Sequence, residues 1–292
     1  MTVPTSLAIA WLALGALSGQ APDDRFPSSE QTRAEFEALC RRQKESSNPF
    51  FGEQMIAGYR QRLATPTSVP RIHIEARASL AYTLVRLGRH EEALAELERV
   101  RAELEETGGG PPAFHRQVLA LMGVAHFQLA EDRNCIALHT EASCILPIRA
   151  GAIHAEPEHA RRAGDRFLEV LQVQPDDVNA RWLLNLARML SGDYPQGVPE
   201  PLRVPAEMLE PQPGSEGLPF LLDLAPRLGL DVLDLAGGAV VDDFDGDGRL
   251  DLISTTWDPC GPMRAFRNDG RGGFEDVTTA WGLDAQLGGL NL

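Results

Sequence analysis

The chain of 292 residues has room for two ordinary domains joined by a linker. Its hydrophobic content of 43% is enough to bury real cores, which excludes a globally disordered chain. The formal net charge of −15 predicts an acidic surface that repels phosphate backbones, so the composition argues against nucleic-acid binding. Such a surface is compatible with divalent cations, because carboxylates can gather into cation sites.

The N-terminal segment has the pattern of an export signal, predicted over residues 1–19. Its apolar run 7–17 is too short to span a bilayer and has the length of the apolar part of a signal peptide. Ala16 and Ser18 supply the small residues of a cleavage site, although residues 1–6 lack the usual Lys or Arg. We therefore predict an extracytoplasmic protein with no membrane span after signal cleavage. A buried N-terminal helix is the alternative for this segment.

Residues 28–192 are predicted to form a helical domain. Ser28 and Gln31 have the spacing of a capping box at a helix start, and apolar residues follow at helical spacing. The pair Asn48-Pro49 ends this helix, and a second helix is expected over residues 51–63.

Small and large apolar residues after position 70 recur at the spacing of a 34-residue helical-hairpin repeat. The positions that fit are Ala76, Leu80, Ala81, Leu84, Leu87, Ala93, Leu97 and Val100. Ala81 and Ala93 are small enough for two helices to approach closely, and Gly88 can end the first helix in a left-handed turn. The segment resembles a tetratricopeptide repeat, which implies a solenoid of stacked hairpins with a concave surface for a protein or peptide partner.

A second hairpin of this kind is expected to be interrupted by a long insertion. Its first helix is predicted over residues 114–129, and its second helix contains Phe167. The insertion 130–159 is longer than most structureless loops in compact domains. A further helix is predicted over residues 178–190, with Trp182 in the core.

The insertion contains Cys135, His139 and Cys144, and their spacing leaves two interpretations open. In an exported protein, Cys135 and Cys144 are close enough in sequence to form a disulfide around a short loop. Alternatively, thiolate and imidazole suit a soft metal such as zinc or copper, with His154 and His159 also in the insertion. The spacing lacks the paired Cys-x-x-Cys of structural zinc sites, which favours the disulfide.

The other two of the four cysteines are Cys40 and Cys260. Disulfide connectivity cannot be deduced from sequence alone. Cys40 has an apolar helical position and Cys260 lies in a Pro-Cys-Gly-Pro loop, so we expect a buried thiol and a loop thiol rather than a pair.

A proline-rich linker is predicted over residues 193–217, and the sequence period changes after it. Short strands separated by Gly, Asn and Asp turns are expected in the C-terminal region 218–292, over residues 238–242, 250–256, 263–267 and 274–278. Four strands in about forty residues is the size of one blade of a β-propeller. The predicted fold class is therefore α+β and multidomain, with helices first and strands second.

The most specific motif is the acidic loop DFDGDGRLD, which runs from Asp243 to Asp251. Its alternating carboxylates can converge on one hard cation, and we predict Ca²⁺. The predicted ligands are Asp243, Asp245, Asp247, the backbone carbonyl of Arg249, and Asp251. Ser254 stands where an EF-hand has glutamate, so a β-hairpin calcium loop is favoured over an EF-hand. A solvated acidic turn that binds nothing is the alternative.

The segments DDFDGDGRLDLI, FRNDGRGGFEDVT and GLDAQLGGLN resemble the FG-GAP/VCBS repeat, in the form found in cartilage acidic protein-like (ASPIC/UnbV) bacterial proteins. That resemblance implies an exported chain with helical repeats first and a calcium-stabilised propeller next, acting in binding or adhesion without an assigned catalytic role. The sequence ends where the family pattern continues into a second acidic loop, so we expect an N-terminal fragment carrying one blade.

The predicted function is an exported calcium-binding module for protein interaction or adhesion, and we do not expect an enzyme. The alternative is an extracytoplasmic enzyme or a transition-metal-binding protein that uses the Cys/His insertion 135–159. The metal content of the purified protein distinguishes the two hypotheses, because only the second requires zinc or copper.

Overall fold

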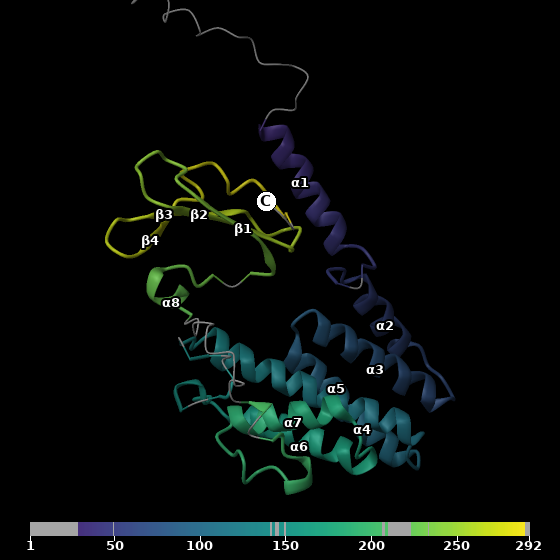
Figure 1. Ribbon diagram of the computed structural model, residues 1–292. Helices are drawn as coiled ribbons and strands as arrows, with labels where there is room; N and C mark the ends of the chain where they lie inside the picture. Colours follow the sequence, from purple (N-terminus) through teal and green to yellow (C-terminus); the bar gives the residue numbers. More distant parts are fainter. Residues whose placement is uncertain are drawn as a thin grey trace, which may run out of the picture.

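A computed structural model describes most of the chain. The described residues are 29–48, 50–140, 142–143, 146–148, 150–205, 208–209, 223–232 and 234–289. The predicted signal peptide 1–19 and Cys144 lie outside these residues. Within the described part, helices come first and a four-stranded antiparallel sheet follows (Figure 1), which confirms the expected α+β class.

The helical part is built from consecutive helices that pack on their neighbours in sequence, α3 with α4, α4 with α5, α5 with α6, and α6 with α7. The helices are α1 (Ser29–Lys44), α2 (Gln54–Ala64), α3 (Pro70–Arg86), α4 (His90–Glu106), α5 (Pro112–Glu131), α6 (Glu158–Val173), α7 (Val178–Leu190) and the single turn α8 (Ala225–Leu228). Shorter helical turns cover Asp132–Ile136, Ala150–Ala152 and Glu200–Leu202.

Local signals in the sequence account for several helix ends. Pro70 occupies the start of α3, where its missing N–H costs no intrahelical hydrogen bond. Gly88 follows α3 with φ of 72°, a left-handed conformation that favours glycine, and the helix stops there. Asp177 caps α7, since its side chain accepts a 2.9 Å hydrogen bond from the backbone N–H of Ala180.

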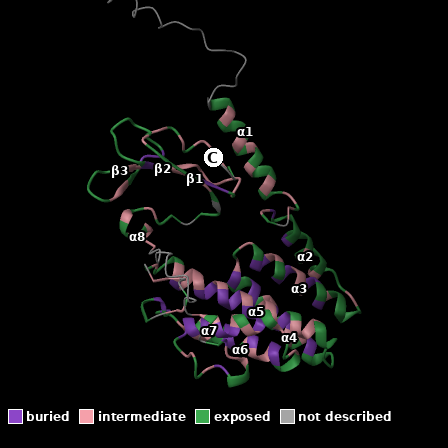
Figure 2. Ribbon diagram, in the orientation of Figure 1, coloured by how far each residue is buried: buried purple, intermediate pink, exposed green. Residues whose placement is uncertain are grey.

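The helical core is formed by the helices from α2 through α7, where buried residues concentrate in Figure 2. Ala81 on α3 and Ala93 on α4 are fully buried, so the backbones of these helices approach closely at small residues. Gly123 on α5 serves the same purpose against α6. A Cβ atom at Gly123 would lie 2.7 Å from Cε1 of the buried Phe167 ring.

Two parts of the helical region differ from the sequence-based expectations. Trp182 on α7 is 38% exposed rather than a core residue, because the buried face of α7 is formed by smaller side chains such as Leu184 and Ala187. Helix α1 has no buried residue among those described. It lies beside the sheet and away from α3–α7 (Figure 1).

The sheet has the strand order β1-β2-β3-β4, with each strand antiparallel to the next. The strands are β1 (Ala236–Asp242), β2 (Asp251–Thr256), β3 (Arg264–Asn268) and β4 (Phe274–Asp276), which confirms the four predicted strands. The pairing of β1 with β2 shifts between Ala236 and Ala239, so Gly237 and Gly238 form a bulge opposite Thr255. The sheet buries few large side chains, with Phe266 at 2% exposure the largest.

A disulfide joins Cys40 to Cys260, so the expectation that these cysteines are separate thiols is wrong. Their Cα atoms lie 5.0 Å apart although 220 residues separate them in the sequence. Helical periodicity assigned Cys40 to an apolar face of α1, but α1 buries none of its described residues, and Cys40 bonds to the loop between β2 and β3. The pairing depends on how α1 lies against the sheet, and the local sequence pattern does not encode that placement.

The close approach of α5 and α6 gives a stability prediction. We expect Gly123→Ala to lower the free energy of unfolding by about 1–3 kcal/mol, because the added methyl group overpacks against the Phe167 ring. Urea unfolding followed by circular dichroism measures the change.

Gly58→Ala is the matched control, because Gly58 is an exposed position within α2 with no atom near an added Cβ. This substitution should raise stability by about 0.5–1 kcal/mol through helix propensity. An unchanged midpoint for Gly123→Ala would show that α5 and α6 do not pack as closely as described.

Candidate metal centre and side-chain clusters

The acidic loop connects β1 to β2, and its backbone is organised by its own carboxylates. Asp243 accepts hydrogen bonds from the backbone N–H groups of Gly246 at 2.8 Å, Asp247 at 3.0 Å and Gly248 at 2.9 Å. Gly246 and Gly248 have φ of 78° and 84°, left-handed conformations that glycine adopts without a steric penalty. The sequence therefore forms a tight turn around Asp243.

This turn brings three of the predicted ligands together. Asp243, Asp245 and Asp247 each present a carboxylate oxygen, and these oxygens all lie within 4.8 Å of one another. Asp243 is half-buried, while Asp245 and Asp247 are exposed. An all-oxygen, negatively charged set fits a hard cation such as Ca²⁺ or Mg²⁺ better than a soft transition metal.

Asp251 is not part of this group of three carboxylates, and ligation by the backbone carbonyl of Arg249 stays a prediction. Asp251 is fully buried, and its two oxygens accept backbone hydrogen bonds from Phe244 at 3.2 Å and Asn268 at 2.9 Å. These bonds hold the acidic loop and β3 to the start of β2. The Arg249 side chain pairs with the Asp247 carboxylate, so its guanidinium partly neutralises the group that a cation would use.

The Cys/His insertion begins with the turn Asp132–Ile136 and brings Cys135 next to His154. The Cys135 Sγ atom lies 3.3 Å from Nε2 of His154, which is buried. The predicted partner His139 contacts the backbone carbonyl of Cys135 at 2.8 Å through Nδ1. Cys144 lies outside the described residues, so the predicted Cys135–Cys144 disulfide stays a prediction.

His139 instead connects the insertion to the segment that precedes the sheet. Its Nε2 lies 2.8 Å from Oδ2 of Asp223, and the other oxygen of Asp223 accepts a hydrogen bond from the backbone N–H of Ala225 at 3.0 Å. The Ala225 hydrogen bond, followed by the His139 contact, lowers the pKa of Asp223. The carboxylate is therefore ionised at neutral pH and available to this pair.

Two further histidines meet between α5 and α6. His126 is buried and its Nδ1 lies 3.1 Å from Nδ1 of His159. Burial, followed by the neighbouring His159, lowers the pKa of His126 to about 4, and burial also lowers the pKa of His159. Arg133 and Arg162 lie close enough to His159 to oppose positive charge there. The pair of histidines is therefore a poor cation site.

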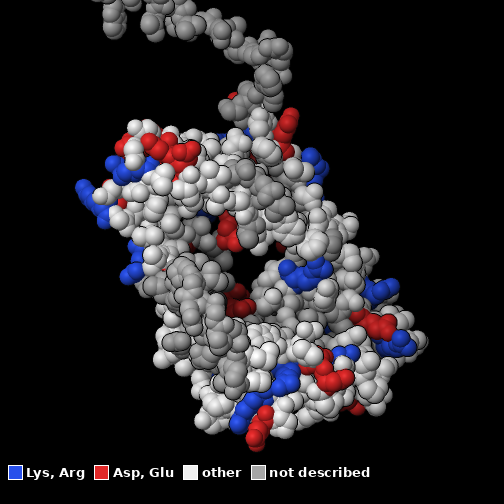
Figure 3. Space-filling view, in the orientation of Figure 1, with Lys and Arg blue, Asp and Glu red and all other residues white. Residues whose placement is uncertain are grey.

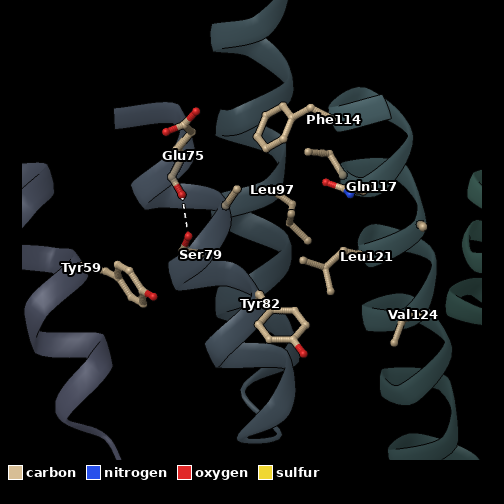
Figure 4. Close-up of a pocket in the computed structure, with 12 residues that line it drawn as sticks. Tyr59, Glu75, Ser79, Tyr82, Leu97, Phe114, Gln117, Leu121 and Val124 are labelled. Atoms are coloured by element: carbon tan, nitrogen blue, oxygen red, sulfur yellow. Dashed lines mark hydrogen bonds between the residues drawn. The ribbon is translucent and has the colours of Figure 1, made fainter. Parts of the chain in front are cut away.

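An apolar groove opens on the helical region, with a cavity volume of about 810 Å³. Figure 4 shows Tyr59 reaching from α2, and Phe114 and Leu121 reaching from α5, toward the same space beside α3. Glu75 is the one ionisable carboxylate in the lining, and it pairs with Arg71 at 2.6 Å. The groove therefore offers apolar and aromatic surface with little net charge. The sequence predicted a concave surface without identifying these residues.

No match was found when the chain was compared with protein-family models, curated proteins and solved structures. Among the described helices, none combines the length and the apolar character needed to cross a membrane.

The buried histidine at the α5–α6 interface predicts an acid-sensitive stability. Unfolded His126 titrates near 6.5, whereas the folded group has a pKa of about 4, so the unfolded state binds protons more readily. The contribution of His126 to the free energy of unfolding is fully present above the pKa of the unfolded group. It should be lost as the pH falls from about 6.5 to 4, which lowers the free energy of unfolding by about 3 kcal/mol. Urea midpoints across this pH range measure the loss.

We expect His126→Leu to reduce the acid-dependent loss of stability, because leucine takes up no proton. His73→Leu removes an imidazole that contacts the Thr65 carbonyl and serves as the control. An acid profile of His126→Leu identical to that of the unmodified chain would contradict the role of His126.

Proposed function

We propose that this protein is an exported calcium-binding module for protein interaction or adhesion. The observation that carries the proposal is the convergence of Asp243, Asp245 and Asp247 within one tight hairpin turn. Three carboxylates held this close repel one another, and a bound divalent cation relieves that repulsion. Ca²⁺ suits the site because it accepts flexible, oxygen-rich coordination.

The fold-level proposal is a tetratricopeptide-like solenoid over residues 28–192, with the insertion 130–159, followed by a linker 193–217. Close helix contacts at Ala81, Ala93 and Gly123 support the solenoid, because this repeat depends on small residues where helices cross. The four consecutive antiparallel strands support the first blade of an FG-GAP/VCBS propeller in region 218–292.

In this proposal the cation has a structural role. The loop lies between β1 and β2, and the buried Asp251 already ties its base to β3 through the Asn268 N–H. A cation held by Asp243, Asp245 and Asp247 would fix the remaining, exposed part of the turn. Arg249 would release Asp247 as the cation takes over neutralisation of that carboxylate.

The groove between α2 and α5 is the proposed surface for a partner. Its lining is apolar and nearly neutral, so it favours an apolar segment of a protein or peptide over a charged ligand. Tyr59, Tyr82 and Phe114 supply aromatic surface, which is enriched where proteins bind other proteins.

An extracytoplasmic location is supported by the disulfide between Cys40 and Cys260. Such bonds form and persist outside the reducing cytosol in most organisms. The location is also consistent with the proposed Ca²⁺ ligation, because extracellular modules use calcium sites of modest affinity.

The calcium proposal predicts a stability change on adding the ion. We expect millimolar Ca²⁺ to raise the melting temperature of the full chain relative to chelator, because the ion binds the folded loop and not the unfolded chain. Differential scanning calorimetry measures the shift. Asp245→Ala should abolish it by removing one of the three converging carboxylates.

Asp231→Ala is the control, because it removes the same charge from an exposed position before β1. The calcium-dependent shift should survive this substitution. Equal melting temperatures in Ca²⁺ and chelator for the unmodified chain would refute the proposal, and an equal shift with Mg²⁺ would remove the preference for Ca²⁺.

The alternative function, an enzyme or transition-metal protein, has one observation in its favour, the 3.3 Å approach of Cys135 Sγ to His154 Nε2. Our proposal predicts that the purified chain retains no stoichiometric zinc or copper. Elemental analysis by mass spectrometry measures this directly. Stoichiometric zinc or copper that is lost in His154→Ala and kept in His73→Ala would favour the alternative.

A further inference from the structure

In the described part of the chain, the N-terminal helix contacts the sheet region through a disulfide and an ion pair. Helix α1 buries none of its described residues, and the disulfide from Cys40 joins it to the loop between β2 and β3. Among the described residues, Arg33 of α1 also lies 3.8 Å from Asp284 of the sheet region, and both of these side chains are exposed. An exposed pair at this distance contributes little stability, so the disulfide is the main connection.

The loop that carries Cys260 is firmly part of the sheet region. The Cys260 N–H donates to Asp258 at 2.8 Å, Met263 N–H donates to the Gln286 carbonyl at 2.7 Å, and Gly288 N–H donates to the Gly261 carbonyl at 2.8 Å. Because these hydrogen bonds hold the loop, a bond to Cys260 also restrains the position of the sheet.

Next to the disulfide, one aromatic cluster connects the sheet to the helical region. The Trp257 ring centroid lies 5.4 Å from Phe50 and 5.1 Å from Phe51. The Arg86 guanidinium on α3 lies 4.6 Å from the Phe50 centroid and 5.6 Å from that of Tyr82. Phe50 is 51% exposed and Trp257 is 43% exposed, so this contact is shallow.

Elsewhere the sheet and the helices α3–α7 are separate. Among the described elements, no strand packs closely against a helix. The space-filling view shows the surface deeply hollowed between the sheet and these helices (Figure 3). On the far side from the disulfide, His139 pairs with Asp223 in the segment that precedes the sheet. Few interactions would therefore hold the sheet in place without the disulfide.

We propose that the Cys40–Cys260 disulfide is a reducible latch that fixes the sheet against the helical region. Both cysteines are partly exposed, so a dithiol reductant can reach the bond. This inference stands on the disulfide and its neighbours, and it does not depend on the calcium or partner proposals.

The chemistry of the latch is thiol–disulfide exchange. A thiolate of the dithiol attacks one sulfur, forming a mixed disulfide and releasing the other cysteine as a thiolate that takes up a proton. The second thiol of the reductant then closes its own disulfide and releases the remaining cysteine. Two electrons and two protons pass from the dithiol to Cys40 and Cys260, which become thiols.

Opening the latch would separate Trp257 from Phe50 and Phe51, because this aromatic contact is shallow and no longer has a covalent bond beside it. Tyr82 lines the apolar groove and also contacts Arg86, which lies over Phe50. The latch therefore acts at the edge of the groove, and its opening would widen access to that edge.

The test compares the oxidised full chain with the chain reduced by dithiothreitol. We expect reduction to increase the radius of gyration in small-angle X-ray scattering and to increase acrylamide quenching of tryptophan fluorescence. Trp257→Phe should lose the added quenching, which assigns it to that residue. Mass spectrometry after alkylation establishes that Cys40 and Cys260 form the bond before reduction and are thiols after it.

Two cysteine variants separate this bond from the other cysteines. The double substitution Cys135→Ser with Cys144→Ser should keep the response to dithiothreitol. The double substitution Cys40→Ser with Cys260→Ser should show the expanded, quenchable state without reductant and no further response. If a variant fails to fold, the comparison of scattering and tryptophan quenching between the oxidised and reduced unmodified chain still tests the latch.

Two results would overturn the latch. One is an oxidised chain in which Cys40 and Cys260 are not bonded to each other. The other is a reduced chain that has both thiols but keeps the radius of gyration and the tryptophan quenching of the oxidised form.

Discussion

The close packing of helices at small residues is the constraint on which the described structure depends. Ala81 and Ala93 are fully buried, and Gly123 leaves no room for a Cβ atom beside the buried Phe167 ring. These residues lie on α3, α4 and α5, and the same helices, together with Tyr59 of α2, line the apolar groove. The proposed partner surface is therefore a consequence of how the core is packed.

Polar interactions organise the part of the sheet that carries the acidic turn. Its acidic turn is shaped by backbone N–H groups that donate to Asp243, and its base is held by the buried carboxylate of Asp251. These donors offset part of the charge of the loop without a cation. The remaining exposed carboxylates, Asp245 and Asp247, are the groups that a bound ion would neutralise.

The two parts of the molecule meet through few side chains, and those side chains are chemically diverse. The described connections include a disulfide, an aromatic cluster around Trp257 and the His139–Asp223 pair. Each responds to a different condition, since a disulfide depends on redox state and a His–Asp pair on pH. In the extracytoplasmic location that we propose, the disulfide stays closed until a dithiol reductant attacks it.

The sequence by itself determined the secondary structure and the acidic turn. Periodicity, caps and glycine positions are local, so they predicted helices such as α3, the four strands, and the convergence of Asp243, Asp245 and Asp247. Tertiary structure decided the rest. The Cys40–Cys260 bond, the exposure of Trp182 and the burial of Asp251 against Asn268 depend on contacts between distant segments. Local sequence patterns do not encode contacts between distant segments, because the packing of the whole chain sets those contacts.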